Sequence, residues 1–111
     1  MEELFMKECP LSYALNILNG KWKLKIVYRI SCSNLIRFNE LKRQLDGISN
    51  VILSKCLHEL NEDKIVNRKQ YEEIPPRVEY SLTELGKEIE PALEQFMKWG
   101  IKAHSEINKR Y

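Results

Sequence analysis

Apolar residues recur at helical spacing over most of this chain. The spacing predicts a first helix over about 10–18, which Pro10 can begin because the amide at that position has no partner inside a helix. Asn19 and Gly20 then end this helix. A second helix ends at the polar loop 31–34, and a third begins at about Arg37. Their inward positions are Trp22, Leu24, Ile26, Val27 and Ile30 in the second helix and Leu41 and Leu45 in the third.

A turn and a strong helix start follow in the middle of the chain. Asp46-Gly47 is a turn signal, and Ser49 is a favourable N-cap because its hydroxyl can accept a hydrogen bond from a first-turn amide. The fourth helix is expected to run from Ser49 to about Asp63, with a buried stripe of Leu53, Leu57 and Leu60. Two short amphipathic helices joined by a glycine-containing turn form a helix-turn-helix, here over about 38–63.

The next segment, about 65–83, has the pattern of a β-hairpin. In its return strand Val78, Tyr80 and Leu82 face one side and the residues between them face the other, which is the period of a half-buried strand. The connecting loop, 72–77, contains Pro75-Pro76, which cannot donate backbone hydrogen bonds, so its tip should be stiff and projecting. A helix-turn-helix followed by a projecting hairpin is a winged helix, and this arrangement usually faces DNA.

The last helix is expected over about 84–108, capped by Thr83 and bent at Glu90-Pro91 or at Gly100. Its apolar residues exceed what one small domain covers, so the first and last helices are predicted to pack across the two-fold axis of a homodimer. The fold class is α+β and mostly helical: one winged helix-turn-helix domain over 1–111, with a two-stranded β-hairpin wing and N- and C-terminal dimerisation helices. The residues expected at the dimer interface are Leu4, Phe5, Leu11, Leu93, Phe96 and Trp99.

Charge and cysteine content say little about function and more about the cellular compartment. The net charge is +2, and the segment 37–77 carries eight Lys or Arg against seven Asp or Glu, so DNA affinity must depend on where the charges point. No apolar run approaches the roughly 20 residues that span a bilayer, and the start of the chain has no secretory signal. The three cysteines have no paired spacing, which fits a reduced, cytoplasmic protein.

Metal and enzyme chemistry find little support in the sequence. Cys56 and His58 are two residues apart on a helix and point about 200° away from each other, so they cannot chelate one ion. The chain has no P-loop, no dinucleotide-binding glycine pattern and no nucleophile elbow. We therefore expect no catalytic residue, no cofactor and no metal site, and a protein that is not an enzyme.

The outward face of the fourth helix carries the candidate DNA contacts. Asn50, Val51, Ser54 and Lys55 lie opposite the leucine stripe, near the helix end that reaches base edges in a helix-turn-helix. Asn50 is suited to adenine and Val51 to a thymine methyl group. For Arg77, a groove contact from the stiff loop and an ion pair with a nearby glutamate both remain open. With the backbone contacts of flanking elements included, the expected DNA-binding residues are Arg37, Arg43, Ser49, Asn50, Val51, Ser54, Lys55 and Arg77.

Several short motifs occur in a single order between about Cys9 and Ile101. They are Cys9-Pro10, Gly20-Lys21-Trp22, Arg37-Phe38-Asn39-Glu40-Leu41, Gly47-Ile48-Ser49 and, most specific, Pro75-Pro76-Arg77-Val78-Glu79-Tyr80-Ser81-Leu82-Thr83-Glu84-Leu85-Gly86. In this order they resemble the HxlR family of bacterial transcriptional regulators, which are relatives of the MarR winged-helix proteins. The resemblance implies a dimeric DNA-binding protein, often a repressor near its own gene. In some members the cysteine equivalent to Cys9 senses oxidants or electrophiles.

The chain departs from the family pattern at three positions. Lys64 stands where the family usually has Gly after the recognition helix, so a residue with a side chain would have to adopt a positive φ there. Val51 occupies a recognition-helix position that is often polar or basic in relatives. Gln70 replaces an apolar residue on the wing strand.

Cys9 is the candidate redox-sensing residue. It precedes Pro10 at a predicted helix N-terminus, where the helix dipole and the unpaired amides favour a thiolate. The alternative is that Cys9 is a small apolar residue that anchors the first helix.

Together these features predict a transcriptional regulator, expected to be a repressor, that binds a pseudo-palindromic operator as a homodimer and responds to oxidants or electrophiles through a cysteine. Its expected partners are double-stranded DNA and a second copy of the chain, with no membrane and with any small-molecule effector left open. The alternative is a winged-helix module for protein–protein assembly with little affinity for DNA.

Overall fold

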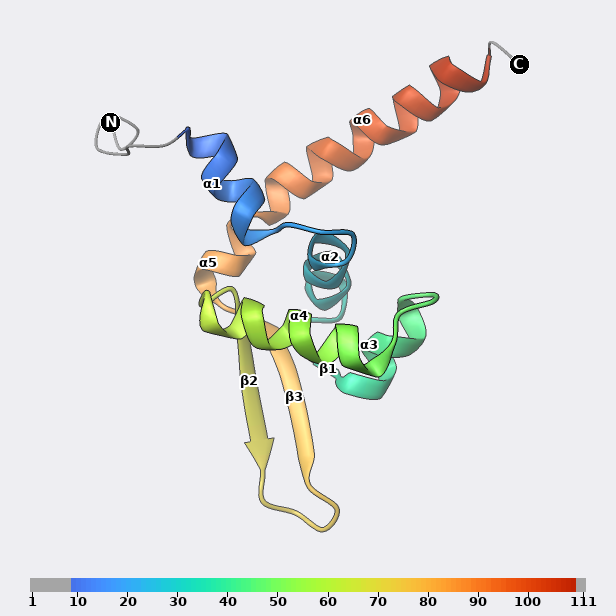
Figure 1. The fold of residues 1–111 in the computed structure, drawn as a ribbon. Coiled ribbons are helices and arrows are strands. Elements are labelled where there is room, and N and C mark those ends of the chain that lie inside the picture. Colours follow the sequence, from blue (N-terminus) through green and yellow to red (C-terminus); the bar gives the residue numbers. More distant parts are fainter. Residues whose placement is uncertain (1–8, 110–111) are drawn as a thin grey trace.

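The computed structural model describes residues 9–109, so the predicted interface residues Leu4 and Phe5 lie outside the described part of the chain. Figure 1 shows a helical body from which a hairpin extends on one side and two helices extend on the other. The elements follow the order α1 (Pro10–Ile17), α2 (Lys23–Ser33), β1 (Ile36–Arg37), α3 (Phe38–Gln44), α4 (Asn50–Glu62), β2 (Val66–Tyr71), β3 (Arg77–Leu82), α5 (Glu84–Lys87) and α6 (Glu90–Asn108).

Helices α3 and α4 and the hairpin β2–β3 lie where the sequence predicts the helix-turn-helix and the wing. Gly47 makes the turn between the two helices with φ +87, a conformation that favours glycine. The hydroxyl of Ser49 accepts a hydrogen bond from the amide of Ile52 at 3.1 Å, which confirms Ser49 as the N-cap of α4. The winged-helix fold is therefore confirmed.

The sheet has one strand more than the hairpin that the sequence predicts. Its order is β1-β3-β2 and all pairs are antiparallel, with Ile36 opposite Tyr80 and Val66 opposite Leu82. Strand β1 has only two residues, which is too short to show an alternating pattern in the sequence. It forms because the extended backbone just before α3 pairs with the edge of β3 that the wing leaves open.

The core lies between α2, α4 and the sheet. Leu53, Leu57 and Leu60 of α4 are at most 2% exposed, so the predicted leucine stripe is confirmed. It packs in one cluster with apolar residues of α2, α3 and the three strands, among them Ile26, Val27, Ile30, Leu41, Ile36, Val66, Tyr80 and Leu82. Beside this cluster the buried ammonium group of Lys23 lies 3.5 Å from the carboxylate of Glu59, which ties α2 to α4.

Helix α2 is longer than predicted. The prediction of a loop over 31–34 was wrong for residues 31–33, which are helical. Ser31, Cys32 and Ser33 form the last turn of α2, and the hydroxyl of Ser31 donates a hydrogen bond to the carbonyl of Tyr28 at 2.6 Å. This local bond lets a serine stay inside a helix. The helix ends only at Asn34, which has φ 62.

The expected C-terminal helix is two helices, and the break lies at the predicted Glu90-Pro91 position. The hydroxyl of Thr83 accepts a hydrogen bond from the amide of Gly86 at 2.9 Å, so Thr83 caps the short α5, as predicted for the last helix. Helix α6 begins at Glu90 with Pro91 in its first turn and continues without interruption past Gly100. Of the two predicted positions for a bend, the structure has the break at Glu90-Pro91 and none at Gly100.

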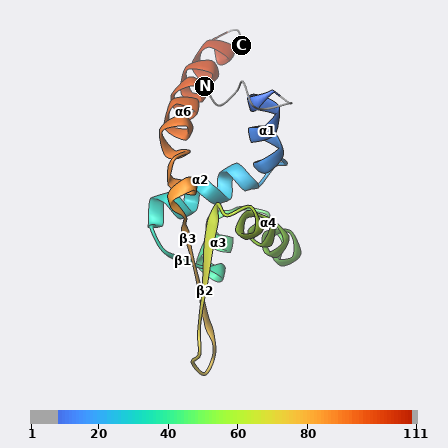
Figure 2. The same cartoon turned by 90° about the vertical axis from the view of Figure 1, so that its left-hand side faces the viewer.

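Helices α1 and α6 extend away from the body on the side opposite the wing, as the two views in Figures 1 and 2 show. Helix α1 has no buried residue, and the one buried residue of α6 is Leu93. None of the helices in the described part of the chain combines the length and the apolar character needed to cross a membrane.

Candidate nucleic-acid interface

The N-terminal half of α4 presents polar and small apolar side chains to solvent. Asn50, Val51, Ser54 and Lys55 are all exposed, and Val51 is 75% exposed although it is apolar. The leucine stripe fixes this orientation because it occupies the opposite side of the same helix. The four residues predicted for base and backbone contacts therefore share one accessible surface.

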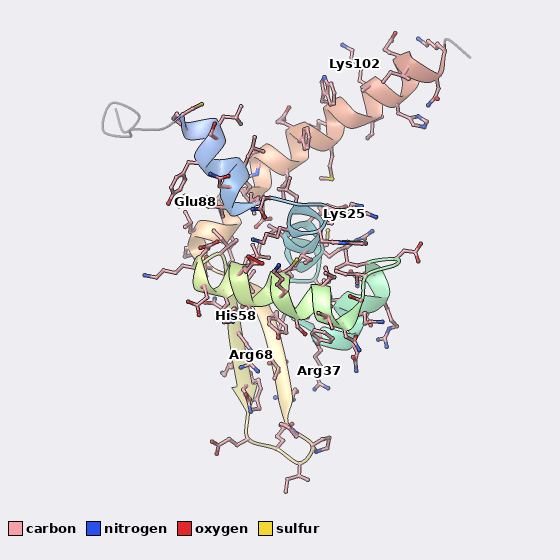
Figure 3. All side chains as sticks on the ribbon, in the orientation of Figure 1. Lys25, Arg37, His58, Arg68, Glu88 and Lys102 are labelled. Carbon is pink, nitrogen blue, oxygen red and sulfur yellow. The ribbon has the colours of Figure 1, made fainter. Side chains whose placement is uncertain are left out.

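Three of the predicted backbone contacts meet in one cleft between α3 and the part of the wing next to its tip. Arg37 of β1, Arg43 of α3 and Arg77 of β3 line a cavity of about 430 Å³, together with Phe38, Asn39, Glu40, Pro76 and Val78. We call these three residues and their walls the arginine cleft. In Figure 3 the labelled Arg37 lies on the same side of the molecule as the wing, whereas Lys25 and Lys102 lie away from it.

Arg77 lies in strand β3 and not in the connecting loop in which the sequence placed it. It is the first residue of β3, opposite Tyr71, and its side chain is only 29% exposed. Its guanidinium lies 4.0 Å from the centre of the Tyr71 ring and 3.6 Å from a carboxylate oxygen of Glu73. The structure therefore contains the ion pair with a nearby glutamate, and the DNA contact of Arg77 stays a prediction.

The tip of the wing is apolar and acidic. Ile74 is fully exposed between Glu73 and the Pro75-Pro76 pair, and Glu72 is also exposed. The positive charges of the wing lie on its strands: Lys69 stacks over Tyr71 at 4.9 Å, and Arg68 lines a second cleft. The tip loop therefore offers little attraction to phosphate, and the strands of the wing offer more.

The second cleft lies between α4 and the wing and has a volume of about 240 Å³. Ser54, His58 and Asn61 of α4 line it on one side, and Arg68 and Tyr80 line it from the strands. Figure 3 shows the labelled His58 and Arg68 close to each other below α4. Phe38 lines both clefts, and Ser54 connects the second cleft with the exposed face of α4.

Two residues of this region were missed by the sequence reasoning as functional candidates. Glu40 forms an ion pair with Arg43 and accepts a hydrogen bond from the side-chain amide of Gln44 at 3.2 Å. These two hydrogen bonds hold the pKa of the Glu40 carboxyl below its usual value. The ammonium group of Lys69 and the guanidinium group of Arg77 both lie over the ring of Tyr71. The spacing of Glu40 and Arg43 on one helix was a usable signal, whereas the position of Tyr71 depends on strand register.

The residues predicted for the dimer interface divide into two groups. Leu11 of α1 and Phe96 and Trp99 of α6 are 59–65% exposed, and the two aromatic rings stack at 6.2 Å. Leu93 is only 8% exposed and packs into the core of its own chain. The exposed apolar surface is completed by Tyr13, Leu15, Met97, Ile101 and Ile107. An apolar surface of this extent on two extended helices is typical of an assembly interface.

The three cysteines differ in their surroundings. Cys9 is exposed at the N-cap of α1, and its carbonyl accepts a hydrogen bond from the amide of Tyr13 at 3.0 Å. Cys32 is exposed beside Tyr28, and its thiol is the main cause that raises the pKa of the Tyr28 phenol. Cys56 is half-buried, and burial raises the pKa of its thiol. Within residues 9–109, no three His, Cys, Asp or Glu side chains are placed to hold a metal ion together.

A helix-turn-helix with a β-hairpin wing and basic clefts beside the second helix defines a winged-helix protein of the nucleic-acid-binding class. The model of the HxlR-like helix-turn-helix family matches residues 17–108, so this chain belongs to that family. The family resemblance noted in the sequence is thereby confirmed.

Relatives and solved structures support this assignment. An uncharacterized HTH-type transcriptional regulator from Halalkalibacterium halodurans is 43% identical over 97 residues, which cover 87% of this chain and 86% of that protein. The structure of the redox regulator HypR in its reduced form is 37% identical with a TM-score of 0.84, over 93% of this chain and all of that chain. A structure assigned to the MarR family from Porphyromonas gingivalis W83 is 42% identical with a TM-score of 0.79, over 86% of this chain and 93% of that chain.

Proposed function

We propose that this protein is a homodimeric transcriptional repressor that binds a pseudo-palindromic operator, with one α4 helix in each half-site. The observation that carries the proposal is the shared surface of α4, on which Asn50, Val51, Ser54 and Lys55 are all exposed on the side away from the leucine stripe. A helix with this exposed N-terminal half fits the major groove, where Asn50 can pair with an adenine and Val51 can contact a thymine methyl group.

The elements beside α4 support a division between sequence recognition and contacts to the DNA backbone. The hydroxyl of Ser49 accepts the capping hydrogen bond and keeps its own proton available for a phosphate oxygen. Arg37, Arg43 and Arg77 surround the arginine cleft and would contact the DNA backbone. In this proposal α4 selects the sequence, and the arginine cleft fixes the register of the protein on the duplex.

The exposed apolar surface of α1 and α6 supports dimerisation. Leu11, Phe96 and Trp99 would pack across a two-fold axis with the other exposed apolar residues of these helices. Both helices lie opposite the wing in Figure 1, so an interface there would leave both α4 helices accessible to one face of DNA. A two-fold axis then requires half-sites about one DNA turn apart, roughly 34–36 Å.

Control by oxidants or electrophiles through Cys9 is the second part of the proposal. Cys9 is exposed at the end of α1, and α1 is one of the two helices expected at the dimer interface. A chemical change at this thiol would act on the interface and alter the distance between the two α4 helices. The names of the HypR structures, which describe a redox regulator, support this part by analogy.

The experiment that tests the central proposal is the salt dependence of DNA binding. Genomic fragments bound by the protein are mapped, and the affinity for one such fragment is compared with that for random duplex at several salt concentrations. An operator-binding protein should prefer its fragment at all salt concentrations and should lose affinity for both duplexes steeply as salt rises.

Protein–protein assembly remains the second candidate function, because the wing tip carries Glu72, Glu73 and the fully exposed Ile74. An acidic and apolar tip is suited to a protein partner rather than to phosphate. The absence of any salt-dependent affinity for duplex DNA would favour this alternative over the repressor.

A further inference from the structure

The arginine cleft brings together three guanidinium groups from three separate elements. Arg37 comes from β1, Arg43 from the last turn of α3 and Arg77 from the start of β3. The cavity of about 430 Å³ has Phe38, Pro76 and Val78 in its walls, so part of its surface is apolar. Guanidinium groups suit phosphate because each presents its N–H donors in a planar fork.

Two of the three arginines already face a carboxylate of the same chain. Arg43 forms an ion pair with Glu40, which itself lines the cleft, and Arg77 lies 3.6 Å from Glu73. Arg37 takes part in no ion pair among the described residues. The Nε of Arg77 is buried and has no hydrogen-bond partner within residues 9–109. Donor capacity in the cleft therefore exceeds what its own acidic side chains accept.

We propose that the arginine cleft binds one phosphate group of the DNA backbone, and that Glu40 competes with this phosphate for Arg43. The inference rests on the proposed DNA-binding function and adds the residue that limits its strength. In the unbound protein Glu40 holds the Arg43 guanidinium at the edge of the cleft. When DNA binds, a phosphate oxygen replaces the Glu40 carboxylate as the acceptor for that guanidinium.

The competition affects every DNA sequence equally. Glu40 does not lie on the exposed face of α4 that carries Asn50 and Val51, so it does not contact base edges in the proposed complex. Hydrogen bonds keep the pKa of its carboxyl low, so Glu40 remains negatively charged at neutral pH. Glu40 therefore lowers the affinity for operator and random duplex by the same factor and leaves their ratio unchanged.

The test compares the full-length wild type with Glu40→Gln, which keeps the shape of the side chain and one acceptor oxygen but removes its charge. An exposed ion pair is worth up to about 1 kcal/mol, so Glu40→Gln should bind both duplexes about two- to fivefold more tightly. The slope of log affinity against log salt should become steeper by up to about 0.9, the value for one phosphate contact. The ratio of operator to random affinity should stay constant.

Two further variants separate this mechanism from a general change in charge. Glu94→Gln removes the same charge from an ion pair with Lys98, 3.7 Å away on α6 and distant from the cleft. This matched control should leave DNA affinity unchanged. In the Arg43→Gln background, Glu40→Gln should produce no gain, because Glu40 acts through Arg43 and the two effects are then not additive.

The outcomes are distinct from those for the proposed function. A wild type without salt-dependent affinity for duplex DNA would remove the proposed function itself. If the wild type binds DNA, three results would each overturn the competition by Glu40. They are unchanged or weaker binding by Glu40→Gln, an equal gain from Glu94→Gln, and a gain from Glu40→Gln that persists in the Arg43→Gln background. The wild type can also be tested for binding of pyrophosphate without DNA. If Arg43→Gln loses this binding but keeps its affinity for DNA, the cleft binds a free oxyanion and not the DNA backbone.

Discussion

The hydroxyl of Thr83 donates a hydrogen bond to the carbonyl oxygen of Lys64 at 2.7 Å. The same hydroxyl lies 3.2 Å from the carbonyl of Ile65, and the amide of Thr83 donates to that carbonyl at 3.0 Å. Because Lys64 follows α4 and Thr83 precedes α5, this cluster joins both ends of the wing to the helices beside it. The direction of the wing relative to α4 therefore depends on a few backbone groups at its base.

Lys64 adopts a positive φ of 63, as expected from the family pattern that usually has Gly at this position. A left-handed conformation costs a residue with a side chain about 1–2 kcal/mol, whereas Gly loses about 0.5–1 kcal/mol of chain entropy on folding. Lys64→Gly should therefore raise the free energy of unfolding by roughly 0.5–1 kcal/mol. Urea denaturation measures the change, and Lys64→Ala, which keeps the backbone strain, should show no such gain.

Gly86 lies against the backbone of Ile65, where a Cβ atom would collide with the carbonyl oxygen. Gly86→Ala should therefore lower the free energy of unfolding by about 1–3 kcal/mol, the usual effect of overpacking. Gly100 is the matched control, because a Cβ there would meet nothing within 4 Å in the described chain. Gly100→Ala should stabilise α6 by up to about 1 kcal/mol. Equal effects of the two substitutions in thermal denaturation would contradict the close contact.

Asn50 is exposed at the first position of α4, where a bidentate bond to adenine would give selectivity. Asn50→Ala should weaken operator binding by about 1–3 kcal/mol and change the affinity for random duplex little. Lys55→Ala should instead weaken both and reduce the salt slope by roughly one. Fluorescence anisotropy with both duplexes gives these values. Equal losses on both duplexes for Asn50→Ala would make Asn50 a backbone contact.

Phe96 and Trp99 form a stacked and exposed aromatic pair on α6. Phe96→Asp should convert the dimer to a monomer, because a carboxylate buried in an apolar interface without a partner is strongly unfavourable. Light scattering at micromolar concentration measures the mass. Lys102→Asp changes an exposed charge on the same helix and should leave the dimer intact. A wild type that is already monomeric would remove both the dimer and the palindromic operator.

Cys9 and Cys56 should respond differently to an oxidant or an alkylating agent. Burial raises the pKa of the Cys56 thiol, so less of its reactive thiolate is present at neutral pH, and its modification should be slow. Mild oxidation should lower operator affinity in the wild type and not in Cys9→Ser. Cys32→Ser shows whether the second exposed thiol takes part. If Cys9 resists alkylation and Cys9→Ser only lowers stability, the thiol serves packing and not control.

The sequence was sufficient where one local pattern determines the structure. The α4 helix has its N-cap, its leucine stripe and its exposed face within one short segment. The residue type at Ser49 predicts the cap, and periodicity predicts the two faces. The positive φ of Lys64 was expected from the family pattern, which usually has Gly at this position after the helix.

The arginine cleft could not be predicted as a cleft because its members are joined only by the tertiary fold. Arg37 reaches it through the pairing of β1 with β3, and Arg77 is placed by its register opposite Tyr71. Neither the short strand nor the register has a pattern of its own in the sequence. The sequence therefore predicted the individual arginines and a glutamate partner for Arg77, but neither the cleft nor the pairing of Arg43 with Glu40.

Helix α1 has eight residues and buries none of them within its own chain. A helix shorter than about 12–15 residues is only marginally stable in water without packing. The helical state of α1 is therefore linked to whatever covers Leu11 and Leu15, and in the proposed dimer the cover comes from the second copy. Dilution and oxidation would then act on the same segment, because monomers would fray the helix end at which Cys9 lies. The amount of this protein in a cell thereby becomes one of the variables that set the reactivity of its own thiol.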